Sequence, residues 1–105
     1  MGYLKFEWDE RKNQENIRKH GISFQEATSV FYDDDAIIFD DPDHSIEEER
    51  FMILGIIERP KGHLTHAIGI VCHCYREGES IRIISAREAT KKERTSYINH
   101  LGGVQ

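Results

Sequence analysis

Residues Ile81–Arg94, IRIISAREATKKER, decide the fold, because they change from the two-residue period of a strand to the spacing of a helix. Arg82 stands between two isoleucines, a small-residue junction follows, and five of the fourteen Lys and Arg side chains lie in this stretch. A strand followed by a basic helix brings guanidinium groups together, and their planar forks match phosphate oxygens. The alternative interpretation is an ordinary amphipathic C-terminal helix with a solvated basic face.

Elsewhere in the chain, segments with the period of a strand likewise alternate with segments that have the spacing of a helix. We predict strands at about 3–8, 37–39, 50–57, 64–75 and 80–85, and helices at about 9–20, 23–32 and 87–100. Turn signals at 60–62 and 77–79 predict an antiparallel meander of the later strands. The order β-α-α-β-β-β-β-α predicts a small α+β domain, an antiparallel sheet with two N-terminal helices and one C-terminal helix.

Capping residues mark the two N-terminal helices. Asp9 is placed to accept from the first free backbone N–H groups, and Gly21 to end the first helix in a left-handed conformation. Ser23 and Glu26 form a capping box for the second helix. The apolar positions of these elements predict a core that includes Phe6, Phe24, Val30, Phe31, Phe51, Ile53, Ile68, Ile70, Ile81 and Ile83.

Composition limits the class of protein. Residues 1–105 are predicted to form a single domain, with 38% hydrophobic and 31% charged residues. Because no apolar run reaches membrane-spanning length and no signal peptide is recognised, we expect a cytoplasmic protein without membrane contact. Cys72 and Cys74 are two residues apart on one strand face, with about 6.5–7 Å between their Cα atoms, which is poor disulfide geometry, so they are predicted to be free, buried thiols. The spacing of His and Cys residues supplies no metal site, and no cofactor is expected.

The net charge of −5 is unevenly distributed. Residues 1–58 carry six Lys and Arg against fifteen Asp and Glu, which gives −9, whereas residues 59–105 carry eight against four, which gives +4. A segment with nine acidic residues among 33–49 does not fit the spacing of a calcium-binding loop. A basic region within an acidic domain remains compatible with binding a phosphate.

Three arginines are the main candidates for chemistry. Arg50 and Arg82 are expected on the sheet face away from the core, and Arg87 at the start of the last helix, whose free N–H groups suit an anion. Each could also simply be solvated. His20 is the candidate for proton transfer, although a His in the last turn also stabilises the helix dipole. Glu93 and Tyr97 could contribute to proton transfer or to packing.

The run from Phe6 to Ala27 resembles the opening signature of the BrnT toxin family. That signature reads Trp-Asp-x-x-Lys, Asn-x-x-Lys-His-Gly and Phe-x-x-Ala, and it matches at Trp8, Asp9, Lys12, Asn16, Lys19, His20, Gly21, Phe24 and Ala27. Later marks are similar too: Glu49-Arg50 before a strand with Gly55, the stretch from Ile83 to Arg87, then Glu93-Arg94 and Tyr97.

The resemblance implies a RelE-like fold and a metal-independent endoribonuclease that acts as the toxin of a type II toxin–antitoxin pair. It implies RNA as substrate, inhibition of translation and growth, and neutralisation by a BrnA-like antitoxin that binds DNA in the complex. The expected catalytic residues are Arg50, Arg82, Arg87 and His20, with Lys19, Lys91 and Arg94 binding substrate. The alternative is a non-catalytic binding module that acts only as the partner of a DNA-binding antitoxin.

Overall fold

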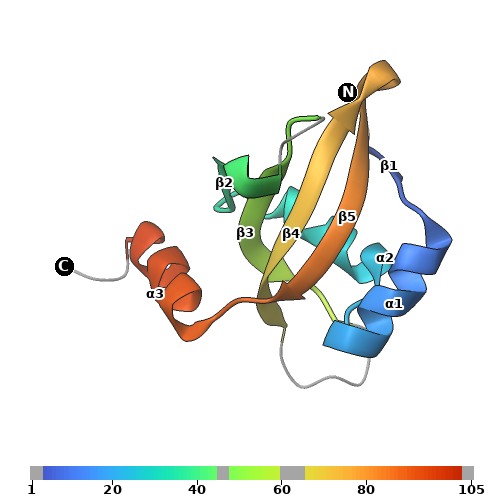
Figure 1. Cartoon of the computed structure of the whole chain (residues 1–105). Helices are drawn as coiled ribbons and strands as arrows, with labels where there is room; N and C mark the ends of the chain where they lie inside the picture. Colours follow the sequence, from blue (N-terminus) through green and yellow to red (C-terminus); the bar gives the residue numbers. More distant parts are fainter. Residues whose placement is uncertain (1–3, 45–47, 60–65, 103–105) are drawn as a thin grey trace.

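The computed structural model describes residues 4–44, 48–59 and 66–102, and shows a five-stranded sheet with helices on both faces (Figure 1). The spatial order of the strands is β1-β5-β4-β3-β2. Their bounds are β1 Lys5–Glu7, β2 Ile37–Asp40, β3 Phe51–Ile57, β4 Ala67–Arg76 and β5 Ser80–Glu88. The helices are α1 Glu10–His20, α2 Phe24–Ala27 and α3 Lys91–His100, with 3₁₀ turns η1 Thr28–Tyr32, η2 Pro42–His44 and η3 Glu77–Glu79.

The predicted α+β class and element order are confirmed. Strands β2 to β5 form the expected antiparallel meander, but β1 pairs parallel with β5, so the whole sheet is mixed. The parallel pairing joins segments about 75 residues apart, for example Glu7 with Arg82, and no turn signal in the sequence announces it. The predicted turn at 60–62 and the first residues of the strand predicted at 64–75 lie outside the described residues.

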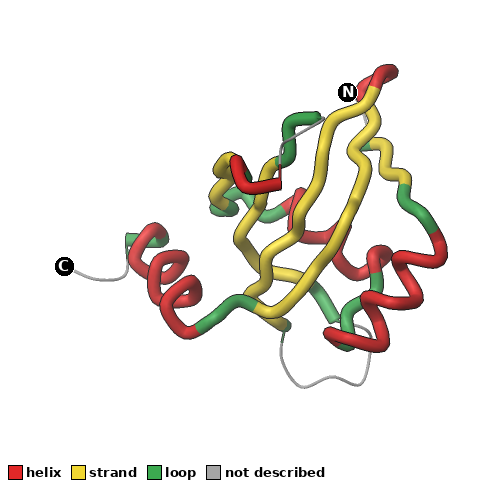
Figure 2. Tube along the Cα trace, viewed as in Figure 1, coloured by secondary structure: helices red, strands yellow, loops and turns green. Residues whose placement is uncertain are grey.

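The helix caps follow the predicted chemistry. The Asp9 side chain accepts from the backbone N–H groups of Arg11 and Lys12, and Gly21 ends α1 at a φ of 73°. Ser23 and Glu26 form the expected capping box. The helix predicted at 23–32 instead consists of a single α-helical turn followed by 3₁₀ turn η1. Figure 2 draws both in red.

Two apolar clusters hold the layers together, one on each face of the sheet. The first packs α2, η1 and the residues after α1 against the sheet, and contains Ile22, Phe24, Ala27, Val30, Ile53, Ile57, Val71, Ile83 and Ala86. The second lies beneath α3 and contains Leu54, Ile70, Ala89 and Tyr97. Of the predicted core, Phe6 and Phe31 pack at the rim of the first cluster and Ile68 beside the second, whereas Phe51 remains half-buried.

Side chains from helical segments protect the sheet where strand pairing stops. β1 pairs with β5 only as far as Arg82, and beyond it Asn16 of α1 bonds both backbone groups of Ala86, at 2.8 and 3.0 Å. At β3, Asp33 and Ser29 accept from the N–H groups of Ile56 and Glu58. These side chains satisfy edge groups that would otherwise be open to pairing with another chain.

Candidate functional site

Arg82 projects from the sheet face opposite the first core cluster. The neighbouring isoleucines 81 and 83 are buried, so the alternation of the strand turns Arg82 the other way, as predicted. Its guanidinium donates to a carboxylate oxygen of Glu7, its register partner on β1, at 2.9 Å. Arg76 approaches the same oxygen at 3.9 Å and pairs with Glu48 at 3.2 Å. Charged side chains of β1, β4 and β5 therefore form a row across this end of the sheet, which contains Glu7, Arg76 and Arg82.

Arg50 lies in line with Arg82. Because Phe51 pairs with His73, continuation of the register places Arg50 opposite Cys74, which itself pairs with Arg82. Two strand spacings separate the Cα atoms of the two arginines, about 10 Å. The register therefore places Arg50 and Arg82 on the same face of the sheet.

Two buried thiols lie beneath this row. Cys72 and Cys74 are free and buried, as predicted. Burial raises the pKa of Cys72 to about 11, with a further increase from Asp41, while the charge of Arg50 opposes it. Burial also raises the pKa of Cys74, next to Glu48. Both thiols are therefore protonated at neutral pH and are poor nucleophiles.

Arg87 belongs to a strand, which corrects the prediction that it starts the last helix. β5 continues in register with β4 as far as Glu88, and α3 begins only at Lys91, after the N-cap residue Thr90. Arg87 therefore has no helix N-terminus beside it. It lies five residues along β5 from Arg82, about 16 Å, so the structure does not bring these two arginines to one phosphate.

The guanidinium of Arg87 is engaged by Glu93 in a two-pronged pair, at 2.9 and 3.1 Å. Hydrogen bonding from Arg87 lowers the pKa of Glu93 to about 2, against the effect of its partial burial. Glu93 is therefore ionised at neutral pH and unsuited to carry a proton there. On the same helix Arg94 donates to the carbonyl of Ala89 at 2.9 Å, while Lys91 is exposed.

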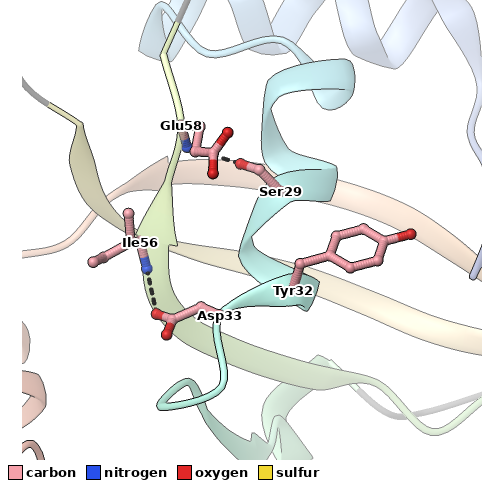
Figure 3. Close-up of a pocket in the computed structure, with 5 residues that line it drawn as sticks. All are labelled: Ser29, Tyr32, Asp33, Ile56 and Glu58. Carbon is pink, nitrogen blue, oxygen red and sulfur yellow. Dashed lines mark hydrogen bonds between the residues drawn. The ribbon is translucent and has the colours of Figure 1, made fainter.

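Tyr97 anchors α3 to the other side of the fold. Its hydroxyl donates to Asp33 at 2.6 Å, and burial together with the Asp33 carboxylate raises the tyrosine pKa. Burial opposes ionisation of Asp33, but the hydrogen bonds from Tyr97 and Ile56 outweigh it and lower the carboxyl pKa. A pocket of about 180 Å³ beside this contact is lined by Ser29, Tyr32, Asp33, Ile56 and Glu58 (Figure 3). The hydrogen bonds of Asp33 and Ser29 hold β3, which makes this a structural contact.

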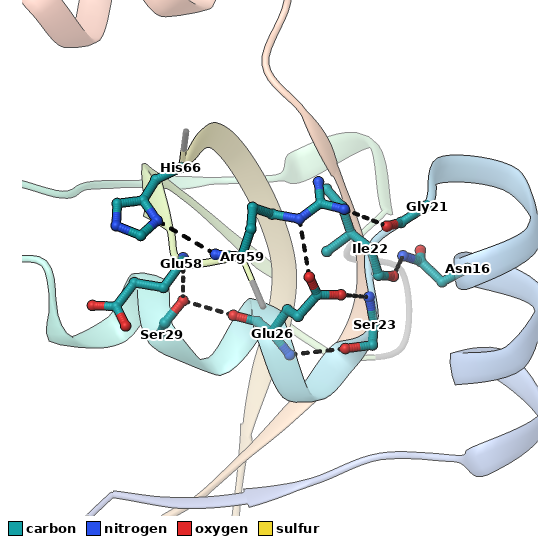
Figure 4. Close-up of polar contacts among 9 residues, drawn as sticks. All are labelled: Asn16, Gly21, Ile22, Ser23, Glu26, Ser29, Glu58, Arg59 and His66. Atoms are coloured by element: carbon teal, nitrogen blue, oxygen red, sulfur yellow. Dashed lines mark hydrogen bonds and ion pairs between the residues drawn. The ribbon is translucent and has the colours of Figure 1, made fainter. Parts of the chain in front are cut away.

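Arg59 ties the end of β3 to the corner between α1 and α2. It pairs with Glu26 at 2.9 Å and donates to the carbonyl of Gly21 at 2.9 Å (Figure 4). Asn16 reaches the same corner through Ile22, whose carbonyl accepts its amide at 2.8 Å. Arg59 was not predicted as a structural or functional residue, because nothing near it in the sequence indicates these partners.

A second pocket, of about 220 Å³, opens between α1 and the edge of β5. It is lined by Lys12, Glu15, Asn16, Lys19, His20, Ile84 and Ser85. Two predicted site residues, Lys19 and His20, therefore lie together here rather than over the Arg50–Arg82 row. Lys12 and Ser85 were missed as candidates. The signal for Lys12 was available, because residues 12, 16 and 19 share one helical face.

The described residues contain neither a helix long and apolar enough to cross a membrane nor a group of three His, Cys, Asp or Glu placed to hold a metal.

Comparisons with known proteins agree with this architecture. The profile of the family "Ribonuclease toxin, BrnT, of type II toxin-antitoxin system" matches residues 8–93. Among solved structures, the ribonuclease toxin BrnT of Brucella abortus is 29% identical, with a TM-score of 0.60, over 85% of this chain and 100% of that chain. No curated protein matches significantly. The fold and the profile define a small α+β toxin of the type II toxin–antitoxin class. The chain belongs to the BrnT ribonuclease toxin family.

Proposed function

We propose that this chain is a metal-independent endoribonuclease that cleaves RNA in the cytoplasm and thereby inhibits translation and growth. The observation that carries the proposal is the register that places Arg50, just before β3, and Arg82 of β5 on one face of the sheet, on either side of Cys74 of β4. Membership of a ribonuclease toxin family supports RNA as the substrate.

In the proposed mechanism, the 2′-oxygen of the RNA attacks the neighbouring phosphorus and the 5′-oxygen of the next nucleotide leaves. A base accepts the 2′-OH proton, an acid protonates the leaving oxygen, and the products are a 2′,3′-cyclic phosphate and a 5′-hydroxyl. Arg50 and Arg82 bind the phosphate and the charge that develops on it. His20, the candidate from the sequence for moving the proton, lies in the pocket beside α1 and not over the Arg50–Arg82 row, so the proposal assigns it no step at this phosphate. The proposal needs no metal because the nucleophile belongs to the RNA.

The remaining basic residues have supporting roles in this proposal. Lys19, Lys91 and Arg94 bind phosphates on either side of the scissile one. Arg87 adds a further positive charge on β5 beyond Arg82, and it holds α3 through its ion pair with Glu93. Arg82 must exchange its carboxylate partner for a phosphate, so we propose that substrate binding displaces Glu7 from Arg82.

Arg82→Ala tests the proposal against a matched control, Arg76→Ala, which removes a neighbouring arginine that contacts the same Glu7. Loss of a preorganised cation costs about 10²–10³ in kcat by analogy with oxyanion-hole donors. We expect that loss in Arg82→Ala, partial recovery in Arg82→Lys, and near wild-type rates in Arg76→Ala. Product analysis should find cyclic phosphate, and EDTA should leave the rate unchanged.

Equal activity of Arg82→Ala and Arg76→Ala, or a requirement for added magnesium, would contradict this mechanism. A wild-type protein that cleaves no RNA would instead favour the non-catalytic binding module.

We also propose that a BrnA-like antitoxin, which binds DNA in the complex, neutralises the toxin. Support comes from the family, whose members are toxins of type II toxin–antitoxin systems.

A further inference from the structure

The pocket between α1 and β5 is lined by two lysines and by an asparagine that is fixed by hydrogen bonds. Lys12 and Lys19 are seven residues apart on α1, about 10 Å along the helix axis, and both line the pocket beside His20. Asn16, between them, is fixed by its hydrogen bonds to Ala86 and Ile22. Glu15 is the one carboxylate among the lining residues. The pocket therefore combines two exposed lysines with a hydrogen-bonded asparagine between them.

The cations of this pocket differ from those of the sheet in how they are neutralised. Arg82 and Arg87 are each paired with a carboxylate at 2.9 Å. Within residues 4–44, 48–59 and 66–102, Lys12, Lys19 and His20 take part in no ion pair. An incoming phosphate therefore meets positive charge here without first displacing a carboxylate. The exposed hydroxyl of Ser85 adds a hydrogen-bond donor on the strand side.

We propose that this pocket is a phosphate subsite for single-stranded RNA, in which Lys12 and Lys19 bind one backbone phosphate and Ser85 donates to it. Ser85 is three residues from Arg82 along β5, about 10 Å. A stacked strand rises about 3.4 Å per nucleotide, so the subsite receives a phosphate within about three nucleotides of the one at Arg82. The inference rests on the proposed ribonuclease function and extends it, since it gives the path of the strand along β5.

The chain offers a matched control for this subsite. Arg11 and Arg18 have the same seven-residue spacing on α1 and are exposed, but lie one residue earlier and are not among the residues that line the pocket. Lys12→Ala/Lys19→Ala and Arg11→Ala/Arg18→Ala therefore remove equal charge from two faces of one helix. Thermal melts followed by circular dichroism confirm that both variants fold. A third variant, Ser85→Asp, places a negative charge on the pocket wall.

Binding is measured with a fluorescein-labelled, fully 2′-O-methylated oligonucleotide, which lacks the nucleophile and stays intact. We expect Lys12→Ala/Lys19→Ala to weaken binding about tenfold, and to reduce the slope of log affinity against log salt by about 0.7, the value for one phosphate contact on a single strand. Ser85→Asp should also weaken binding, whereas Arg11→Ala/Arg18→Ala should leave the slope unchanged. With cleavable RNA, KM should rise and kcat should change little.

Equal losses of affinity and slope in the two double variants would overturn the subsite, because overall charge would then explain both. So would a wild-type protein that does not bind the oligonucleotide at low salt. If wild type binds it and shows the expected difference between variants but cleaves no RNA, the subsite stands and the proposed ribonuclease function fails. If wild type cleaves RNA while the two double variants share one KM, the function stands and the subsite fails.

Discussion

Asn16 joins α1, the corner after it and β5 through one buried side chain. The residue is 6% exposed, and its side-chain amide donates to the carbonyls of Ile22 and Ala86 and accepts from the N–H of Ala86. This side chain thus satisfies backbone groups of β5 that no strand pairs, and it also binds the segment that follows α1. Asn16 occupies a position of the family signature, and its contacts give that position a structural explanation.

Asn16→Ala should lower the free energy of unfolding by about 2–4 kcal/mol, because three buried backbone groups lose their partner. Gln14→Ala, an exposed change on the same helix, should stay within about 0.5 kcal/mol of wild type. Urea denaturation monitored by circular dichroism measures both. A loss below about 1 kcal/mol for Asn16→Ala would mean that water replaces the amide without cost.

At the scale of elements, α3 is held to the sheet by an ion pair in its first turn and by the buried side chain of Tyr97. Glu93, in its first turn, pairs with Arg87 of β5, and Tyr97 inserts its ring into the second cluster and donates to Asp33. Other apolar side chains of this helix, such as Ile98, stay about half exposed. A helix of ten residues is marginal alone, so these contacts decide whether α3 stays docked.

The pair between Glu93 and Arg87 should make the docking of α3 sensitive to acid. The pKa of Glu93 is about 2 in the folded protein, below its ordinary value of 4.5, because of the hydrogen bond from Arg87. The stabilisation is therefore complete above about pH 5 and disappears as the pH falls from 4.5 towards 2. Since both groups are partly exposed, we expect it to be on the order of 1–2 kcal/mol.

Hydrogen exchange of the α3 amides between pH 5 and pH 2.5, corrected for intrinsic rates, measures this effect. Protection in wild type should fall with pH, whereas Glu93→Gln should begin lower and change less. Parallel curves for the two proteins would assign the acid sensitivity to other carboxylates.

At the scale of the whole molecule, the acidic and basic halves of the chain meet in the fold. Glu7, from the acidic half, pairs with Arg82, from the basic half, and Glu48 pairs with Arg76. Arginines of the sheet are therefore neutralised locally by carboxylates from the acidic half, in a protein of net charge −5. A partner that binds the arginines of the sheet must offer carboxylates that compete with Glu7 and Glu48.

We expect the antitoxin to dock an acidic or amphipathic segment on Arg82, Arg87, Lys91 and Arg94. Electrostatic steering should make the association rate fall steeply with salt. Hydrogen exchange of the complex should show new protection at β5 and the start of α3, while a charge reversal, Lys91→Glu, should slow association. Protection confined to other elements would show that neutralisation follows another route.

Features that depend on neighbours within a few residues could be predicted from the sequence. Asp9, Gly21 and the Ser23–Glu26 pair set the helix ends, because capping bonds span two to four residues. The alternation of apolar residues in β5 was enough to place Arg82 on the opposite face from Ile83. These signals yielded the element order and the meander, and the resemblance to the family covered most of the chain.

Contacts between distant segments could not be predicted from the sequence. Asn16 and Ala86 are 70 residues apart, and Tyr97 and Asp33 are 64 apart, so no local pattern relates them. The end of β5 was misplaced for the same reason: residues after Ser85 suit a helix locally, but pairing with β4 continues the strand as far as Glu88. The position of Lys12 beside Ser85 likewise depends on α1 packing along the edge that β1 leaves open, and this arrangement exists only in the folded chain.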